Sequence, residues 1–285
     1  MTKLKFKKYD NAKEFIEENE KLLLEKEWLN NLMVGNYDYA LKNGIDENWI
    51  LSRVTNKDKT ELIMLLRKPW KLLLYSPTEN TTKELYKFVA EELYKVDKNL
   101  PGVNTEKEIG KMFAEEYCKI ANKRCKLHLD MRILVLDKLT APKLRDDVVY
   151  RKAEIKDKEI LKAFMQEFHQ EALNEKLPDE VLEEKFYSYL EKGYYVLEKD
   201  GKIVAQTVVG RKLNKGKGIS GVFTPKQERG KGYAYNLVYR VSKEILEEGA
   251  EYCVLYTDDS NPISNHVYEK IGYERKVDTF DLDFV

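Results

Sequence analysis

Residues 227–234 have the sequence Gln227-Glu228-Arg229-Gly230-Lys231-Gly232-Tyr233-Ala234. They follow a strand-like run, Ile219–Phe223, and they open an amphipathic segment predicted to be a helix. Free backbone N–H groups and the helix dipole make such an N-terminus an anion site. The two glycines permit unusual backbone angles and let a diphosphate come close, while the Arg and Lys add positive charge. The segment therefore predicts a phosphate-binding turn, with an ordinary glycine-containing helix start as the alternative.

A second motif follows the predicted strand Tyr252–Thr257 and reads Asn261-Pro262-Ile263-Ser264-Asn265-His266-Val267-Tyr268-Glu269-Lys270-Ile271-Gly272-Tyr273. Asn261 suits the cap of a helix, and Asn265 lies one turn further on the same side. Gly272 ends the helix. Taken alone, Tyr268 has a plainer interpretation as a core aromatic on a short helix.

Both motifs resemble segments of the GNAT superfamily of acyltransferases. Gln227, Gly230 and Gly232 match the acyl-CoA pyrophosphate loop of that family, Gln/Arg-x-x-Gly-x-Gly/Ala. The second motif resembles the GNAT helix that follows the fifth strand, carries a tyrosine and ends in Gly-Tyr or Gly-Phe. The resemblance covers nearly all of the second half, from about Val148 to Phe284. It implies an α/β fold with a mixed sheet that binds acetyl-CoA or a related acyl-CoA.

The resemblance also implies roles for single residues. Tyr268 would be the catalytic general acid that protonates the departing thiolate, and a phenol pKa of about 10 suits a thiolate of comparable basicity. Main-chain N–H groups of the strand before the turn would stabilise the thioester oxyanion. The implied cofactor-binding residues are Val222, Phe223, Thr224, Gln227, Glu228, Arg229, Gly230, Lys231, Gly232, Tyr233, Ala234, Asn261 and Asn265.

The residue that takes the proton from the acceptor amine is not assigned by the sequence. The candidates are His169, Glu167 and Asp258, each of which has an alternative as an ordinary surface residue. His266 lies two positions before Tyr268, so we expect it to face away from that tyrosine.

A glycine run just upstream, Gly216–Gly221, satisfies the dinucleotide-binding pattern Gly-x-Gly-x-x-Gly. That pattern needs a strand before it and a helix directly after it. Here a strand-like segment, Val222–Pro225, follows instead. We therefore interpret these glycines as a hairpin loop and the start of a strand.

The second half is predicted to alternate strands and helices around a central sheet. The expected strands are Val148–Arg151, Tyr194–Glu198, Ile203–Arg211, Gly218–Phe223, Tyr252–Thr257 and one or two within Tyr273–Phe284; the expected helices are Lys156–Leu173, Asp179–Leu190, Gly230–Glu248 and Asn261–Ile271. A turn at Asp200-Gly201 predicts that the second and third strands form a hairpin.

The first half predicts a looser version of the same order. The expected helices are Ala12–Lys26, Trp28–Lys42, Thr82–Val96 and Thr105–Ala121, and the expected strands are Trp49–Val54, Thr60–Arg67, Lys71–Tyr75 and Leu127–Leu136. We interpret this half as a diverged copy of the second. The predicted domains are 1–140, a degenerate GNAT-like domain, and 148–285, the catalytic one, joined by the linker Leu139–Asp147.

The first half lacks a matching phosphate turn. Its equivalent, Ser76–Thr82, has no glycine and carries Glu79, which would repel a diphosphate. All three tryptophans, Trp28, Trp49 and Trp70, lie in this half. We interpret them as core residues, with an aromatic acceptor pocket as the alternative.

Composition sets limits on the kind of protein and its partners. The chain has 285 residues, 42% hydrophobic and 35% charged, with 50 basic and 50 acidic side chains. A net charge of zero argues against a nucleic-acid partner, and the short basic run Lys5–Lys8 is interpreted as a solvated face. The sequence predicts neither a signal peptide nor a membrane span. Three sparse cysteines predict a reduced, cytoplasmic protein, and Cys118, Cys125 and His128 fit no common zinc spacing, so no metal is expected.

Three functions are consistent with these observations. The main hypothesis is an N-acetyltransferase in which the amine of a small molecule, peptide or protein attacks acetyl-CoA directly. The paired layout favours a second, a relative of the tandem-GNAT aminoacyl or thiol-conjugate synthases. A third is a CoA-binding sensor without turnover. The sequence assigns neither the acceptor nor the acyl length nor the oligomeric state.

Overall fold

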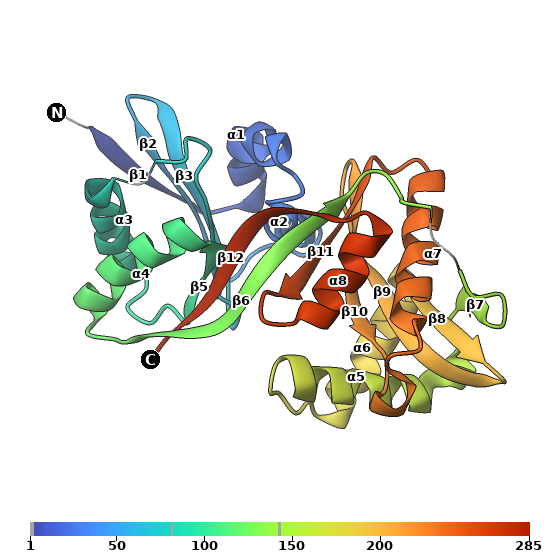
Figure 1. Ribbon diagram of the computed structural model, residues 1–285. Coiled ribbons are helices and arrows are strands. Elements are labelled where there is room, and N and C mark those ends of the chain that lie inside the picture. The colour runs from blue at the N-terminus through green and yellow to red at the C-terminus, as the bar shows by residue number, and fades with distance from the viewer. Residues whose placement is uncertain (1–2, 81, 142–143) are drawn as a thin grey trace. The chain divides into compact units, whose positions relative to one another are not determined.

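The computed structural model describes residues 3–80, 82–141 and 144–285 (Figure 1). Thr81, in the predicted turn Ser76–Thr82, and Pro142 and Lys143, in the predicted linker, lie outside the described residues. The fold is α/β with a mixed sheet, as the sequence predicts. In the described part of the chain, no helix is long and apolar enough to cross a membrane.

The two halves of the chain have the same order of elements. The first half runs β1 (Leu4–Tyr9), α1 (Ala12–Glu25), α2 (Asn31–Asn43), β2 (Trp49–Asn56), β3 (Lys59–Arg67), β4 (Leu72–Tyr75), α3 (Lys83–Val96), β5 (Gly102–Glu106), α4 (Lys107–Ala121) and β6 (Cys125–Leu136). The second runs β7 (Val149–Lys152), α5 (Lys158–Ala172), α6 (Asp179–Lys192), β8 (Tyr194–Lys199), β9 (Lys202–Lys212), β10 (Gly216–Phe223), α7 (Tyr233–Glu247), β11 (Tyr252–Asp258), α8 (Pro262–Ile271) and β12 (Glu274–Phe284), with 3₁₀ turns η1 (Ile155–Asp157) and η2 (Lys226–Glu228). Apart from these turns, each half reads β-α-α-β-β-β-α-β-α-β, which supports the interpretation of a diverged copy.

Two strands of the first half were not predicted, and both corrections make the repeat complete. The run Lys5–Lys8, interpreted as a solvated face, lies in β1, which pairs antiparallel with β2. Leu4 and Phe6 pack against the core, and the lysines between and after them hide this alternation. The segment between the predicted helices Thr82–Val96 and Thr105–Ala121 contains β5, so α4 begins at Lys107 and not at Thr105.

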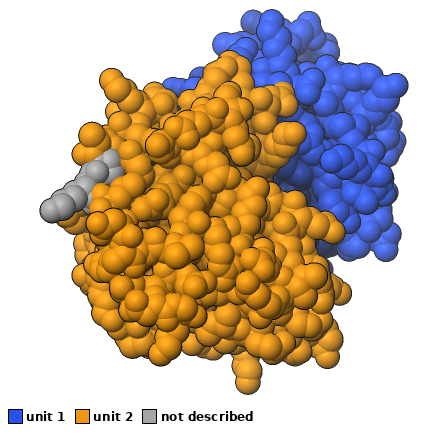
Figure 2. All heavy atoms as spheres, turned by 90° about the vertical axis from the view of Figure 1, so that its right-hand side faces the viewer, with its two compact units in different colours: residues 1–133, 258–260, 276–285 blue, residues 134–257, 261–275 orange. Residues whose placement is uncertain are grey.

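The chain forms two compact units (Figure 2). Unit 1 comprises residues 1–133, 258–260 and 276–285, and unit 2 comprises residues 134–257 and 261–275. These units are groups of residues that pack together, so they differ from the domains 1–140 and 148–285 that the sequence predicts. The predicted domains stay a prediction. Most of β12 therefore belongs to unit 1, although it comes from the second half of the sequence.

In unit 1 the strands lie in the order β1-β2-β3-β4-β5-β12-β6. β12 runs antiparallel to β5, with Leu282 opposite Val103. A Cβ at Gly102 would overlap the carbonyl oxygen of Leu282, so this close approach requires glycine. Helices α3 and α4 cover one face, and Leu282 and Phe284 are buried in the core beneath them. The C-terminal strand thus completes the core of the N-terminal unit.

In unit 2 the strands lie in the order β11-β10-β9-β8-β7, with α7 and α8 on one face and α5 and α6 on the other. β8 and β9 form the predicted hairpin, and β10 runs parallel to β11. The end of β6 contributes Leu134 and Leu136 to the core under α7. Each unit therefore takes part of its core from the other half of the sequence.

Candidate active site

The strands β10 and β11 stop pairing with each other part of the way along β10. Their parallel ladder joins three residue pairs and ends at Gly218 opposite Val254. Both strands continue beyond that point, β10 to Phe223 and β11 to Asp258. Beyond Gly218 and Val254, the main-chain groups on the facing edges of β10 and β11 therefore lie outside the β10–β11 ladder.

A bulge lies in the same part of β10, on its other edge. Ser220 pairs with Val208 of β9 and Phe223 with Gln206, so Gly221 and Val222 together oppose one residue, Thr207. Gly221 has φ +59°, a left-handed conformation that favours glycine. A bulge leaves its extra residue unpaired and re-aims the chain next to it. The structure thus places the predicted oxyanion residues, Val222 and Phe223, at the irregular end of β10, with Thr224 directly after it.

The predicted phosphate turn connects β10 to α7. Gln227 and Glu228 lie in η2, and Gly230 and Gly232 have φ +78° and +80°. A Cβ at Gly230 would meet no atom within 4 Å, so this position faces open space. Glycine is favoured there by the positive φ and not by a lack of room. Gly232 is the N-cap of α7, where no side chain caps the helix and no acid lies in the first turn. These are the features of an anion site at a helix start.

The two cations of the turn are already paired with acids. Arg229 contacts Glu171 at 2.5 Å, and Lys231 contacts Glu228 at 2.9 Å. Arg229 also donates from Nε to the carbonyl oxygen of Thr224 at 2.9 Å, which braces the turn against the end of β10. The positive charge expected from the sequence is therefore partly offset, and the backbone carries more of the anion-binding capacity.

Arg145 is a residue at this turn that the sequence did not single out, because it falls in the predicted linker. Its guanidinium lies 5.3 Å from the centre of the Tyr233 ring, and Nη1 donates to the carbonyl oxygen of Lys231 at 3.4 Å. Asp147 holds the same guanidinium through two hydrogen bonds. Only a three-dimensional structure brings this segment to the turn, since Arg145 and Lys231 lie 86 positions apart in sequence.

Helix α8 begins at Pro262, one residue after the predicted start, and Asn261 is its N-cap. The side chain of Asn261 accepts a hydrogen bond from the backbone N–H of Ser264 at 3.1 Å, which confirms the predicted cap. Asn265, one turn later, is buried, whereas Asn261 is exposed. A role of either side chain in binding CoA stays a prediction.

Tyr268 projects from α8 into the core of unit 2. Its side chain is 6% exposed and meets the ring of Tyr273 edge-on, with 5.9 Å between ring centres. Burial raises the pKa of the Tyr268 phenol well above its usual value near 10. The hydroxyl therefore stays protonated, as a general acid requires. From the sequence we expect a nearly balanced proton transfer from a phenol with a pKa of about 10 to the thiolate. With the raised phenol pKa, this balance holds only if the thiolate is also desolvated beside Tyr268, because desolvation raises the thiol pKa as well.

The segment that contains these features matches a known protein family. Residues 158–273, which include η2, α7 and Tyr268, match the acetyltransferase (GNAT) family. Residues 158–273 therefore match a GNAT domain. A search of curated proteins found no match to this sequence.

Solved structures extend the likeness of fold beyond the GNAT domain. A GNAT-family acetyltransferase from Colwellia psychrerythraea is 13% identical, with a TM-score of 0.60 over 99% of this chain and 100% of that one. A tandem GNAT protein from the clavulanic acid biosynthesis pathway is 12% identical, with a TM-score of 0.60 over 99% and 98%. A GCN5-related N-acetyltransferase from Sphaerobacter thermophilus is 15% identical, with a TM-score of 0.61 over 87% and 85%. The whole chain thus has a tandem GNAT fold.

The candidate bases differ in their surroundings. His169, near the end of α5, has a pKa lowered by burial and by Lys185, and its Nδ1 lies 3.4 Å from Glu175. Glu167 is exposed. One carboxylate oxygen of Asp258 accepts two hydrogen bonds from Ser260, in the turn that follows β11. Of the three, His169 has the chemistry best suited to a base of the GNAT domain, because a neutral imidazole accepts a proton.

The equivalent turn of the first half has an acidic character. Glu79 has φ +53° and pairs with Lys26 at 2.7 Å. The buried Glu61 carboxylate accepts hydrogen bonds from Thr78 and Asn80, at 2.6 and 3.1 Å. Two carboxylates thus occupy the region where the GNAT domain presents glycine amides. Among the described residues of Ser76–Thr82, this acidic character disfavours a diphosphate.

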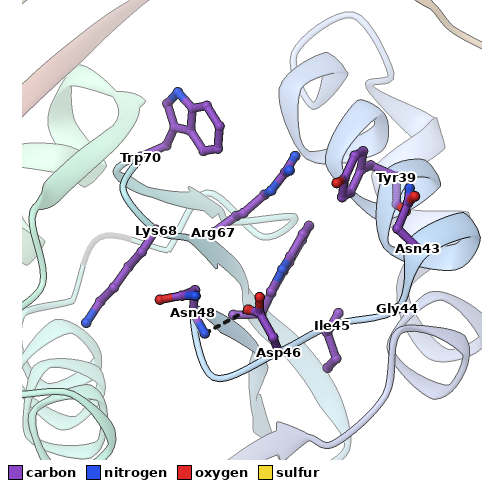
Figure 3. A pocket seen from close by; sticks show the side chains of 10 residues that line it. Tyr39, Asn43, Gly44, Ile45, Asp46, Asn48, Arg67, Lys68 and Trp70 are labelled. Carbon is purple, nitrogen blue, oxygen red and sulfur yellow. Dashed lines mark hydrogen bonds between the residues drawn. The ribbon is translucent and has the colours of Figure 1, made fainter.

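Two of the three tryptophans line a cavity of about 240 Å³ in unit 1 (Figure 3). The Arg67 guanidinium lies 3.7 Å from the ring centre of Tyr39 and 5.2 and 5.0 Å from those of Trp49 and Trp70. Trp49 is buried, as predicted, whereas Trp70 is 60% exposed, so the prediction that all three are core residues is wrong for Trp70. The aromatic pocket considered as the alternative is built around an arginine.

Proposed function

We propose that the protein is an N-acetyltransferase that binds acetyl-CoA on unit 2 and transfers the acetyl group directly to an amine. The observation that carries the proposal is the coincidence of two features on one strand. β10 parts from β11 after Gly218, and its other end leads into a glycine turn at an uncapped helix N-terminus, at Gly232. A diphosphate on that turn would direct the pantetheine arm toward the parted strands.

The chain offers four groups for binding and activation. Backbone N–H groups at the start of α7 would bind the diphosphate, with Arg145 adding a charge from outside the turn. The bulged segment at Val222 would present an N–H to the thioester carbonyl oxygen, where negative charge develops. The exposed Asn261, at the cap of α8, would contact the amide groups of the pantetheine arm.

The reaction would proceed by one displacement at the acetyl carbon. The lone pair of the amine nitrogen attacks the carbonyl carbon and forms the C–N bond, and the C–S bond then breaks. The departing thiolate takes the proton of the Tyr268 hydroxyl and leaves as a thiol. The proton lost by the ammonium nitrogen passes through a base or water and returns to the Tyr268 oxygen, which restores the phenol. Burial of Tyr268 keeps its hydroxyl protonated at neutral pH, and transfer of that proton requires that the thiolate be desolvated beside it.

The experiment combines titration of acetyl-CoA with a thiol-release assay on a panel of amines. We expect the wild-type chain to bind acetyl-CoA and to release CoA with at least one amine. Tyr268→Phe is expected to keep acetyl-CoA binding and to lose about 10²- to 10⁴-fold in kcat. Tyr239→Phe, a tyrosine at the edge of the same core, serves as the matched control and should retain activity.

Two outcomes would overturn parts of the proposal. Unchanged transfer by Tyr268→Phe would remove this tyrosine from the mechanism. Acetyl-CoA binding without release of CoA in the presence of any amine would favour the sensor hypothesis, and failure of acetyl-CoA to bind would overturn the proposed enzyme.

A further inference from the structure

Arg211 lies across the point where β10 and β11 separate. It is the penultimate residue of β9 and pairs with Gly218 of β10, the last residue in the β10–β11 ladder. A Cβ at Gly218 would come within 2.8 Å of the Arg211 Nε. The arginine side chain therefore passes over the backbone of β10, and glycine at 218 makes room for it.

The surroundings of this guanidinium are aromatic. Its central carbon lies 5.8 Å from the ring centre of Tyr256 on β11, and its other ionisable neighbour is the Tyr189 phenol of α6. Nε is buried without a hydrogen-bond partner. Among residues 3–80, 82–141 and 144–285, no carboxylate forms an ion pair with it. Burial lowers the pKa of Arg211, yet a guanidinium stays charged at neutral pH.

A second arginine of unit 2, Arg151, has carboxylate partners, as expected of an arginine with a structural role. Arg151 reaches Asp157 at 2.7 Å and Glu198 at 3.0 Å, so two carboxylates balance its charge. In their place, the Arg211 guanidinium has the Tyr256 ring. A cation whose Nε is buried without a partner is costly, and contact with an aromatic face recovers only part of that cost. The fold thus retains a charged group that its own contacts do not explain.

We propose that Arg211 binds an oxyanion, a carboxylate or a phosphate, carried by the amine acceptor. The planar fork of a guanidinium matches both groups and gains strength in a desolvated site. This inference rests on the proposed function, because the parted strands are where the acetyl group would meet the acceptor. The acceptor class is then an amine with a nearby acidic group, such as an amino acid or a phosphorylated amine.

The position of Arg211 separates this site from the diphosphate turn. Gly218 and Phe223 are five residues apart along β10, which corresponds to roughly 17 Å of extended chain. The turn lies beyond Phe223 and opens α7, whereas the Arg211 guanidinium lies beside Tyr256 of β11, at the last pair of the β10–β11 ladder. One oxyanion site therefore serves the cofactor, and the other remains for the acceptor.

The first test measures stability and needs no knowledge of the acceptor. Thermal unfolding is compared for wild type, Arg211→Met and Arg151→Met. We expect Arg211→Met to unfold at the same temperature as wild type or higher, because it removes an uncompensated charge. Arg151→Met should unfold at a lower temperature, because it leaves Asp157 buried without its partner. A fall in Arg211→Met as large as that in Arg151→Met would make Arg211 structural and overturn the inference.

The second test measures recognition with matched pairs of probes. Phenylalanine is compared with phenethylamine, and phosphoethanolamine with ethanolamine, in the acetyl-transfer assay. We expect wild type to prefer the acidic member of one pair, and Arg211→Met to lose roughly 10- to 100-fold in kcat/KM for that member alone. The preferred pair distinguishes a carboxylate from a phosphate. Equal use of both members by wild type, or an equal loss for both in the variant, would overturn the inference.

A binding arm keeps the inference separate from the proposed enzyme activity. The melting temperature is recorded with acetate, inorganic phosphate or chloride at constant ionic strength and without acetyl-CoA. One of the two oxyanions should raise the melting temperature of wild type and of Gly230→Asp, but not that of Arg211→Met. If catalysis fails and this difference persists, the oxyanion site stands without the enzyme. If neither oxyanion distinguishes wild type from Arg211→Met, the site is overturned even where catalysis succeeds.

Discussion

The backbone N–H of Arg145 donates a hydrogen bond to Oδ1 of Asn236 at 2.7 Å, and Nδ2 of Asn236 donates to the carbonyl oxygen of Gly232 at 2.9 Å. One side chain on α7 thus joins the segment before β7 to the cap of the helix. Arg240 extends the link by donating to the carbonyl oxygen of Arg145 at 2.8 Å. The chain around Arg145 is therefore hydrogen-bonded to the predicted phosphate turn and to α7.

The Arg145 side chain should contribute to acetyl-CoA affinity. We expect Arg145→Gln to bind acetyl-CoA several-fold more weakly and with a weaker dependence on salt, because one cation near the diphosphate is lost. The urea midpoint should not change, since the Arg145–Asp147 pair is exposed to water. Calorimetric titration at two salt concentrations measures both effects. Equal affinity of variant and wild type at low salt would show that the guanidinium does not reach the cofactor.

Gly230 and Gly201 form a matched pair for testing the turn. Both have left-handed backbones, φ +78° and +74°, and a Cβ at either would meet no atom within 4 Å. Substitution by alanine should therefore cost each about 1 kcal/mol in the free energy of unfolding. Only Gly230→Ala should also weaken acetyl-CoA binding, because only its Cβ enters the space of the diphosphate. A parallel loss of affinity in Gly201→Ala, in the β8–β9 hairpin, would mean that strain alone explains the effect.

The pH dependence of kcat/KM follows from two shifted groups. Tyr268 acts while protonated, and its raised pKa moves the alkaline loss above pH 10, so we expect no fall from this residue between pH 7.5 and 9.5. His169 acts as a base only when neutral, and burial lowers its pKa below the usual value near 6.5. Activity that depends on His169 should persist at pH 6.5 and fall at lower pH. His169→Gln would abolish this acid limb if His169 is the base, and an unchanged limb would exclude it.

The C-terminal strand should control the stability of unit 1. Phe284 is 4% exposed and packs on Tyr117 with 5.2 Å between ring centres, so Phe284→Ala should cost about 3–5 kcal/mol. Val285, the next residue, is 61% exposed, and Val285→Ala should change little. Tryptophan fluorescence during urea unfolding reports on unit 1, because Trp28, Trp49 and Trp70 all lie there. A fluorescence transition unaffected by Phe284→Ala would contradict the placement of β12 in this unit.

Local signals in the sequence predicted much of the fold. Helices and strands with clear apolar periods, such as α7 and the β8–β9 hairpin, lie within a few residues of their predicted bounds. β1 was missed because lysines flank its two apolar positions, and β5 because it is short and follows Pro101. The pairing of β12 with β5 depends on contacts between residues about 180 positions apart, and no local pattern encodes that choice.

The candidate site divides in the same way. Backbone-directed features, including the glycine turn and the Asn261 cap, have local signatures that the sequence displays. Arg145 and Arg211 do not, because an arginine in a linker or at the end of a strand resembles any solvated arginine. Their roles depend on neighbours brought in from α7, α6 and β11. The absence of a carboxylate beside Arg211 is visible only once the described chain is folded.

The exchange of strand β12 also bears on how the protein is made. Unit 1 contains residues 1–133, yet it acquires Leu282 and Phe284 only after the whole of unit 2 has been synthesised. During that interval the edge of β5 and the apolar side of α4 have no β12 to cover them. The folding of unit 1 is therefore coupled to the synthesis of β12, and the apolar surface that β12 covers stays exposed until that strand has been made.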